Sequence, residues 1–171
     1  MVVFAKPVLP TFIIGAVVLV LGELTRFWGV SFAGPLTRVT GGVGAPMLVV
    51  AGPFAYVRNP LYVGNILMYG GIGIMASALN PWLVIAAASY FIFQYWMIVS
   101  LEEEFLEKEF GESYDEYRRN VPRFIPRLNA WKPGREADQH PDWKRAVKSE
   151  RRTFQAILLV SILIVLRWIW G

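Results

Sequence analysis

Cysteine is absent from this sequence, and histidine occurs once, as His140. Without cysteine the chain has no disulfide framework, no thiolate zinc site, no iron–sulfur cluster and no cysteine nucleophile. A single histidine excludes a histidine-rich metal site, so we expect no bound metal. Charged residues are also few, at 18% of the chain. These absences remove thiol and metal-cluster chemistry and direct attention to the apolar majority of the sequence.

Hydrophobic residues make up 55% of the 171 residues, and the mean hydropathy is +0.42. A soluble domain of this size rarely hides so much apolar surface, so the composition predicts an integral membrane protein. The net charge is +4 and the isoelectric point is near 9.5. In a membrane protein a basic excess is typical of cytoplasmic loops, and we expect no nucleic-acid partner.

Four apolar runs approach the roughly 20 residues that a helix needs to cross the hydrocarbon core. We predict an all-α, polytopic membrane protein, with residues 1–171 as a single membrane domain, a central helical hairpin and a cytoplasmic cap. The glycine- and proline-rich residues 27–51 are interpreted as an interfacial or re-entrant connection. The sequence does not determine the oligomeric state. The predicted spans are residues 8–24, 61–79, 82–101 and 154–170, and the polar cap is residues 102–152.

The two central spans are predicted to form a hairpin because Asn80-Pro81 separates them. A chain that crosses a membrane and returns leaves both ends of the hairpin on the same side. If that side is the cytoplasm, the inner segments hold all of the 17 Lys and Arg residues except Lys6 and Arg167. This distribution follows the positive-inside rule and predicts that the hairpin ends face the cytoplasm.

A compact polar and aromatic stretch lies at the start of the second span. It has the sequence GPFAYVRNPLYVG at residues 52–64, and the triplet Glu102, Glu103 and Glu104 follows the third span. Pro60 suits the first turn of a helix. Because the hairpin returns the chain to its starting side, both stretches emerge at one face of the bilayer. We predict a binding site at that face.

The polar segment after the triplet carries its own local signals. The third helix is expected to continue to Phe110 and to end at Gly111, which suits a helix C-terminus. Ser113 and Glu116 have the spacing of a capping box for a short helix. Prolines at positions 122 and 126 predict an extended segment, and part of residues 132–152 is expected to form a surface helix.

These motifs occur in an order that resembles a known family. The stretch at residues 52–64, the apolar hairpin and then EEEFLEKEFGESYDEYRRNVPRFIPR at residues 102–127 are similar to the membrane methyltransferases. That family includes isoprenylcysteine carboxyl methyltransferases and phospholipid N-methyltransferases, and the resemblance covers roughly residues 46–127. It implies S-adenosylmethionine as methyl donor, bound on the cytoplasmic side, and a lipophilic or lipid acceptor that enters from the bilayer.

The resemblance also implies which residues bind the cofactor. S-Adenosylmethionine carries a sulfonium cation, an amino group and a carboxylate, so its site needs an acidic group, hydrogen-bond donors and an aromatic or apolar wall. The sequence offers these groups in the two stretches described above. The family's cofactor positions fall on Leu48, Val49, Phe54, Asn59, Pro60, Leu61, Tyr62 and Glu102, and Arg58 is a further candidate.

Two positions depart from the family pattern. Asn59 stands where the family usually has histidine; its amide can donate and accept hydrogen bonds but does not titrate near neutral pH. Ile98 stands one turn before Glu102, where isoprenylcysteine enzymes carry an arginine for the acceptor carboxylate. We expect Arg123 to replace that arginine, or else the acceptor to be an amine or another neutral or cationic lipophile. Glu103 and Arg123 are therefore the candidate catalytic residues on the substrate side.

Simpler readings of the same residues remain open. Glu102–Glu104 can be the solvated end of a helix that pairs with Lys108, Tyr62 can be an interfacial aromatic, and Arg58 a positive-inside anchor. Two other functions are also open. One is a membrane sterol or enone reductase that binds NADPH in the same place, and the other is a non-enzymatic membrane module with a degenerate pocket.

Overall fold

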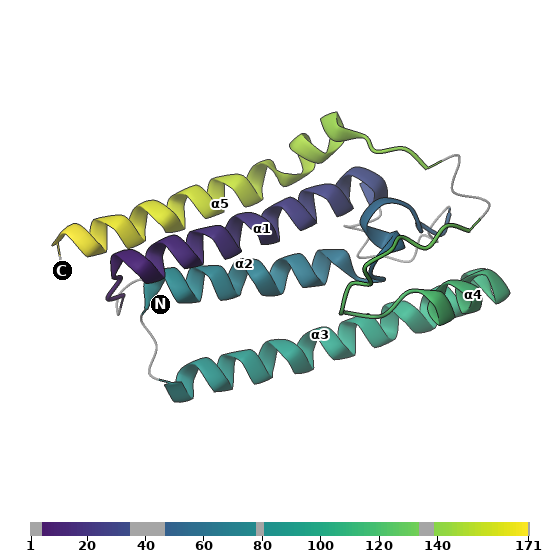
Figure 1. Ribbon diagram of the computed structural model, residues 1–171, viewed down its shortest axis with the longest axis horizontal. Helices are drawn as coiled ribbons and strands as arrows, with labels where there is room; N and C mark the ends of the chain where they lie inside the picture. Colours follow the sequence, from purple (N-terminus) through teal and green to yellow (C-terminus); the bar gives the residue numbers. More distant parts are fainter. Residues whose placement is uncertain (1–4, 35–46, 78–80, 134–138, 171) are drawn as a thin grey trace.

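The computed structural model describes residues 5–34, 47–77, 81–133 and 139–170, and all regular structure in these ranges is helical. The expectation of an all-α fold is therefore confirmed. Four long helices lie along one axis, and two short ones gather at one end (Figure 1). The long helices are α1 (Leu9–Ala33), α2 (Pro60–Ala76), α3 (Pro81–Phe110) and α5 (Trp143–Trp170); the short ones are the 3₁₀ helix η3 (Gly52–Ala55) and α4 (Glu112–Asn120).

Helices α1 and α2 pack with their backbones in contact along a line of glycines. A Cβ atom on Gly71 would lie 2.5 Å from the backbone nitrogen of Leu19 and 2.7 Å from the carbonyl oxygen of Gly15. About two helical turns from Gly15 and Gly71, Gly22 and Gly64 face each other. A Cβ on either would lie 2.8 Å from the carbonyl oxygen of the other. Small residues permit this approach, and packing rather than water exclusion holds such helices together in lipid.

Helix α5 is joined to this pair by a buried group of charged and amide side chains. The Arg26 guanidinium on α1 donates to both carboxylate oxygens of Glu150 on α5, at 3.1 and 3.0 Å, and to Oδ1 of Asn65 on α2, at 2.6 Å. Glu23 also lies within 4.0 Å of Arg26. Glu150 is only 1% exposed. Loss of one partner from such a buried pair typically costs about 3–5 kcal/mol, so this contact fixes the position of α5.

The ribbon of α3 lies apart from that of α2 along most of its length (Figure 1). Aromatic side chains of the two helices meet between them. The Tyr69 and Phe91 rings stack with centroids 5.3 Å apart, and the Tyr62 and Tyr95 rings lie 5.2 Å apart. Aromatic pairs at these separations contribute about 0.5–1.5 kcal/mol each beyond the area they bury. Large rings therefore replace the close backbone contact found between α1 and α2.

Several helix boundaries differ from the expected ones. Helix α1 runs on to Ala33 rather than ending near residue 24, so the first part of residues 27–51 is helical; residues 35–46 lie outside the described residues. Helix α2 ends at Ala76, where Ser77 adopts a left-handed conformation with φ 46°, and residues 78–80 are likewise outside the described residues.

The C-terminal half of the chain combines two expected elements into one. The predicted surface helix and last span form the single helix α5, which begins at Trp143 because the Asp142 carboxylate accepts a hydrogen bond from the Arg145 N–H at 2.9 Å. The end of α3 at Phe110 is confirmed, with Gly111 at φ 51°. The capping box at Ser113 was wrong: α4 starts at Glu112, and Gly111 provides its N-cap.

Length and apolar composition mark α1 and α5 as candidate membrane spans, and α2 is a shorter apolar helix of 17 residues. Lys6 lies at the opposite end of the bundle from η3 and α4, where its backbone N–H donates to the carbonyl of Ala76 at 2.9 Å. The polar segments 52–59 and 112–131 gather at the other end (Figure 1). The long axis of the molecule thus separates one sparsely charged end from one rich in charge.

The glycine line predicts a difference between two neighbouring substitutions in α2. We expect Gly71→Ala to destabilise the protein by about 1–3 kcal/mol, because the added methyl overlaps the α1 backbone. Gly70→Ala is the matched control, since no atom lies within 4 Å of a Cβ there; its higher helix propensity favours stability by up to ~1 kcal/mol. Denaturation of both variants in detergent, followed by circular dichroism, measures the difference. Equal stability of the two would contradict the close packing.

Candidate functional site

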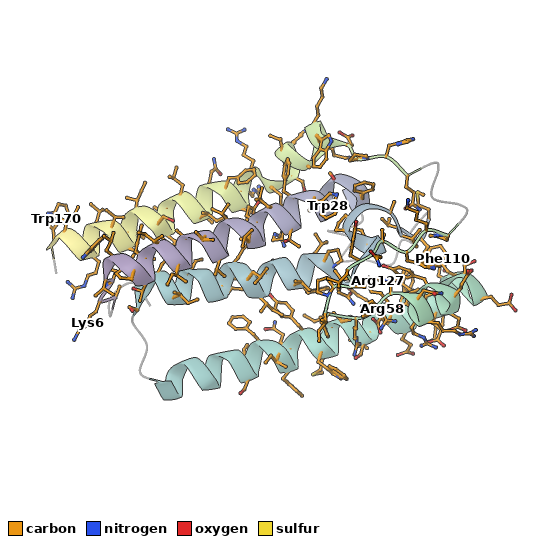
Figure 2. All side chains as sticks on the ribbon, in the orientation of Figure 1. Lys6, Trp28, Arg58, Phe110, Arg127 and Trp170 are labelled. Atoms are coloured by element: carbon orange, nitrogen blue, oxygen red, sulfur yellow. The ribbon has the colours of Figure 1, made fainter. Side chains whose placement is uncertain are left out.

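The loop before α2 is held in shape by its neighbours at the charged end of the bundle. Gly52 has φ 61°, which favours glycine, and a Cβ there would overlap the Phe32 ring. Gly52 is also the first residue of η3. The segment after α4 then runs alongside the loop: Arg58 N–H donates to Pro122 O at 2.9 Å, and Arg127 N–H donates to Tyr56 O at 3.0 Å. Figure 2 shows Arg58 and Arg127 at this end.

Non-helical backbone in residues 121–127 makes this pairing possible. Val121 is extended (φ −118°, ψ 124°), but bends occur at residues 123–125, so the extended segment that the prolines at 122 and 126 predicted is present only in part. An extended backbone exposes N–H and C=O groups that a helix would use internally, so they are free to bond to the loop. Helix α4 packs against the loop, where the Tyr117 hydroxyl donates to Phe54 O at 2.8 Å. The loop that carries the family motif is therefore supported by segments more than 60 residues away in sequence.

Glu102 and Tyr62 form the direct link between the two stretches singled out in the sequence. The Tyr62 hydroxyl donates to a Glu102 carboxylate oxygen at 2.7 Å. Glu102 is exposed, but desolvation by the protein atoms around its carboxyl group raises its pKa. The charge of Glu103 raises this pKa further, and the hydrogen bond from Tyr62 lowers it. The result is an accessible carboxylate, held in one orientation, beside the start of α2.

Glu103 lies between two arginines and an amide. Its carboxylate oxygens are 3.4 Å from an Arg58 nitrogen and 3.3 Å from Arg123 Nε. Asn59 donates from Nδ2 to Glu103 at 3.4 Å and to the Arg123 carbonyl at 3.2 Å. Adjacent residues on a helix point about 100° apart, and Glu102 and Glu103 accordingly contact different partners. Glu103 thereby joins α3, the loop and the extended segment.

Arg123 reaches back from the extended segment onto α3. It donates to the Ser100 hydroxyl at 2.8 Å, and its guanidinium carbon lies 4.5 Å from the centre of the Trp96 ring. A cation over an indole face contributes about 0.5–2 kcal/mol. The contacts place the Arg123 guanidinium on the stretch of α3 just before Glu102, which is where the family's arginine is missing at Ile98.

Buried hydrogen-bond donors without partners mark part of this site. Among the described residues, Arg58 Nε and Nη1 and the Tyr114 hydroxyl are buried and make no hydrogen bond; Arg123 Nε makes none either, although it lies 3.3 Å from the Glu103 carboxylate. Leaving such a group unsatisfied costs about 1–3 kcal/mol. Burial and the nearby Glu103 charge raise the pKa of Tyr114 to about 12, so its hydroxyl stays protonated and able to donate at neutral pH. Together these donors would suit an anionic or hydrogen-bond-accepting group.

The remaining candidate residues lie nearby with different surroundings. Pro60 is the first residue of α2 and is buried, and Leu61 packs its side chain toward Gly29 of α1. Leu48 borders the buried cluster of Val50, Tyr114, Tyr117 and Val121, and Val49 is half-buried. Leu61 therefore contacts the neighbouring helix rather than Glu102.

Glu104 and Tyr56 lie near the site but pair with residues outside it. Glu104 is exposed and pairs with Lys108 at 2.6 Å, which lowers its carboxyl pKa. The Tyr56 ring packs against Trp28, with centroids 5.9 Å apart. Neither side chain shares a described polar contact with Glu102 or Glu103, so the acidic triplet divides into two site residues and one surface residue.

One residue with a clear role at the site escaped sequence reasoning. The Gln139 side-chain oxygen accepts hydrogen bonds from the N–H groups of Val50 and Ala51, at 2.9 and 3.0 Å. Its amide nitrogen donates to the carbonyl of Leu48 at 2.8 Å. Gln139 thus binds the backbone of residues 48–51 as a neighbouring strand would. A lone glutamine in a polar segment carries no local signal of such a distant partner.

The fold and the site together define a class: a helical, largely apolar protein with a carboxylate, arginine and tyrosine cluster at one end of its helices. A sequence model described as phospholipid methyltransferase matches residues 10–113. The chain belongs to this family. The match includes α1, the loop, α2 and all of α3, and so includes Tyr62 and Glu102.

Individual relatives carry different names. The chain is 39% identical to a cobalt-zinc-cadmium resistance protein of Cupriavidus metallidurans over 85 residues, which are 50% of this chain and 38% of that protein. It is 34% identical over 80 residues (47% and 33%) to the protein-S-isoprenylcysteine O-methyltransferase of Schizosaccharomyces pombe. It is 38% identical over 73 residues (43% and 27%) to the methanethiol S-methyltransferase of Crocosphaera subtropica. The chain thus matches well under half the length of each relative, and no solved structure matches it.

The Gln139 contacts predict a local effect on the loop. We expect Gln139→Ala to speed amide hydrogen exchange at Val50 and Ala51 by about fivefold, because each loses a hydrogen bond worth roughly 1 kcal/mol. Gln155→Ala on the exposed face of α5 is the control, since it should leave these amides unchanged. Hydrogen exchange read by mass spectrometry measures the effect. Unchanged protection in Gln139→Ala would mean that other contacts hold the segment.

Proposed function

We propose that this protein is an integral membrane methyltransferase that uses S-adenosylmethionine to methylate a lipophilic acceptor. The observation that carries the proposal is the oriented Glu102 carboxylate, bonded to Tyr62, next in sequence to Glu103, which pairs with Arg58. This arrangement lies within the segment that matches the phospholipid methyltransferase family. The names of two methyltransferases among the relatives support the same reaction class.

The residues present fit the charges of S-adenosylmethionine. Its amino and sulfonium groups are positive, and Glu102 offers an accessible negative charge fixed in direction by Tyr62. Its carboxylate needs cationic donors, and Arg58 has two buried nitrogens without a partner. Leu48 and Phe54 provide apolar surface for an adenine ring on the loop. Arg58, Asn59, Tyr62 and Glu102 are therefore proposed to hold the cofactor, with the backbone of residues 48–54.

The chemistry demands positioning more than reactive side chains. When bound, S-adenosylmethionine would supply a methyl group activated by its sulfonium; the acceptor lone pair would form a bond to the methyl carbon as the carbon–sulfur bond breaks and S-adenosylhomocysteine leaves. The contribution of the protein is then to hold the acceptor in line and to exclude water. Glu103 and Arg123 are proposed to act on the acceptor side. Glu103 pairs with both Arg58 and Arg123, and its single negative charge leaves the two guanidiniums with a net positive charge. The acceptor is therefore proposed to be either an isoprenylcysteine-like carboxylate that contacts Arg123 or a lipid amine.

The same proposal includes the membrane arrangement. We place α1, α2, α3 and α5 as four spans, with the polar segment from Glu102 onward on the cytoplasmic side. Support comes from the two helices long enough to span and from the concentration of Lys and Arg at the site end of the molecule. A lipophilic acceptor would then reach the site from the bilayer without crossing water.

Calorimetric titration of the detergent-solubilised protein tests the class of function. We expect S-adenosylmethionine and S-adenosylhomocysteine to bind and NADPH not to bind. Binding of NADPH alone would favour a membrane reductase, and binding of none of the three a module without activity. A labelled-methyl assay with extracted lipids, an isoprenylcysteine analogue and a small thiol then identifies the acceptor class.

Substitution of Glu102 is predicted to weaken cofactor binding specifically. We expect Glu102→Gln to raise the Kd for S-adenosylmethionine by about tenfold or more, because a charge-assisted contact contributes roughly 1.5–3 kcal/mol. Glu104→Gln is the matched control on the same helix, since Glu104 contacts only Lys108 among the described residues. An equal rise in both variants would show that the acidic charge acts through the helix surface.

The pH dependence of binding follows from the same carboxylate. Burial raises the pKa of Glu102 above the ordinary value for glutamate, and only the ionised form attracts the positive groups of the cofactor. Affinity should therefore be full above the raised pKa and fall as the pH drops through it. Titrations from pH 8 down to the ordinary pKa of glutamate should show this fall in the wild type and a nearly flat profile in Glu102→Gln. A flat wild-type profile would contradict the assignment.

A further inference from the structure

The first half of α5 carries a surface that the methyl-transfer site does not use. A shallow groove of about 500 Å³ is lined by Lys144, Lys148 and Arg151 and by apolar side chains at Val147, Phe154 and Leu158. These positions recur three or four residues apart, so they form one face of the helix. Ala146, Glu150 and Ile164 are buried on the face toward the other helices. The groove therefore faces away from the bundle.

The three cations of this face have no acidic partner within the described part of the chain. Glu150, next to Arg151 in sequence, points to the opposite side and bonds to Arg26, and the Asp142 carboxylate, two residues before Lys144, accepts a hydrogen bond from the Arg145 N–H. Lys144 and Lys148 are exposed, as is Arg151. Each Lys or Arg near an anionic membrane surface attracts it by about fivefold in binding constant. These three positive charges are therefore available to bind an anionic group.

The distribution of polarity along α5 selects the kind of anion. The cations come first, and Phe154 and Leu158, which are 40% and 62% exposed, follow toward the apolar part of the helix. A soluble phosphate would satisfy only the first half of this surface. An amphiphile with an anionic head and a hydrocarbon chain would satisfy both halves. The cationic end of α5 also lies at the same end of the molecule as the polar loop and α4 (Figure 1), where a cytoplasmic headgroup layer would be.

We propose that this face of α5 binds one anionic phospholipid. Its phosphate lies against Lys144, Lys148 and Arg151, and its acyl chain runs along Phe154 and Leu158. The proposal rests on the membrane placement of α5 and does not require methyl transfer, because none of these residues contacts Glu102, Tyr62 or Arg58 in the described structure. A volume of about 500 Å³ is within the range of small-molecule sites and admits a glycerophosphate headgroup.

The experiment uses the full chain in nanodiscs of phosphatidylcholine with a minor fraction of phosphatidylglycerol. Native mass spectrometry counts the lipids retained after release. We expect one phosphatidylglycerol per chain for the wild type, and about a hundredfold weaker retention when Lys144, Lys148 and Arg151 are all changed to Gln. The control changes Lys6, Arg119 and Lys132 to Gln, which alters net charge equally on exposed residues elsewhere; it should retain the lipid.

Three outcomes would overturn the proposal. Equal loss in the two triple variants would indicate general attraction to surface charge. If glycerol 3-phosphate competed as effectively as a short-chain phosphatidylglycerol, the groove would be a free phosphate site without an acyl subsite. Retention of phosphatidylcholine in place of phosphatidylglycerol would indicate an apolar contact alone. Circular dichroism and S-adenosylmethionine titration of the groove variant separate loss of the lipid from loss of the fold or of the proposed methyltransferase function.

Discussion

The ion pairs of Glu103 are the interaction on which the candidate site depends. Within the described residues, α3 makes no close backbone contact like that of α1 with α2, and its polar end is held by Glu103 between Arg58 and Arg123. These side chains come from a helix, a loop and an extended segment. Because Glu103 pairs with both arginines where water is scarce, its removal would leave two guanidiniums without their carboxylate partner. The orientation of Glu102 toward Tyr62 follows from this arrangement.

A second constraint acts at the other side of the bundle. Without a hydrophobic driving force in lipid, helices associate through close packing and interhelical hydrogen bonds. The structure uses the first between α1 and α2, through facing glycines. It uses the second between α1 and α5, through Arg26 and Glu150. The two mechanisms make a rigid three-helix unit, and α3 adds to it through aromatic side chains and the charged site.

The candidate site combines fixed and unsatisfied groups in a way that suits a small charged ligand. Glu102 is oriented, while donors of Arg58 and Tyr114 remain without partners among the described residues. Asn59, where the family usually has histidine, serves as a structural amide that links Glu103 to the Arg123 backbone. The position therefore keeps a hydrogen-bonding role without a titrating group. Gln139 stabilises the loop backbone from a part of the chain beyond the family match.

The sequence by itself determined the helical class, the hairpin and the meeting of residues 52–64 with the glutamates after it, because apolar run length and chain reversal are local properties. It also located Pro60 and Gly111, whose backbone preferences are intrinsic. Only the tertiary structure decided that Gly64 and Gly71 face α1, that Arg26 bonds to Glu150, and that Gln139 holds the loop. Those contacts depend on how each helix is rotated about its axis and on residues far apart in sequence, which no local pattern specifies.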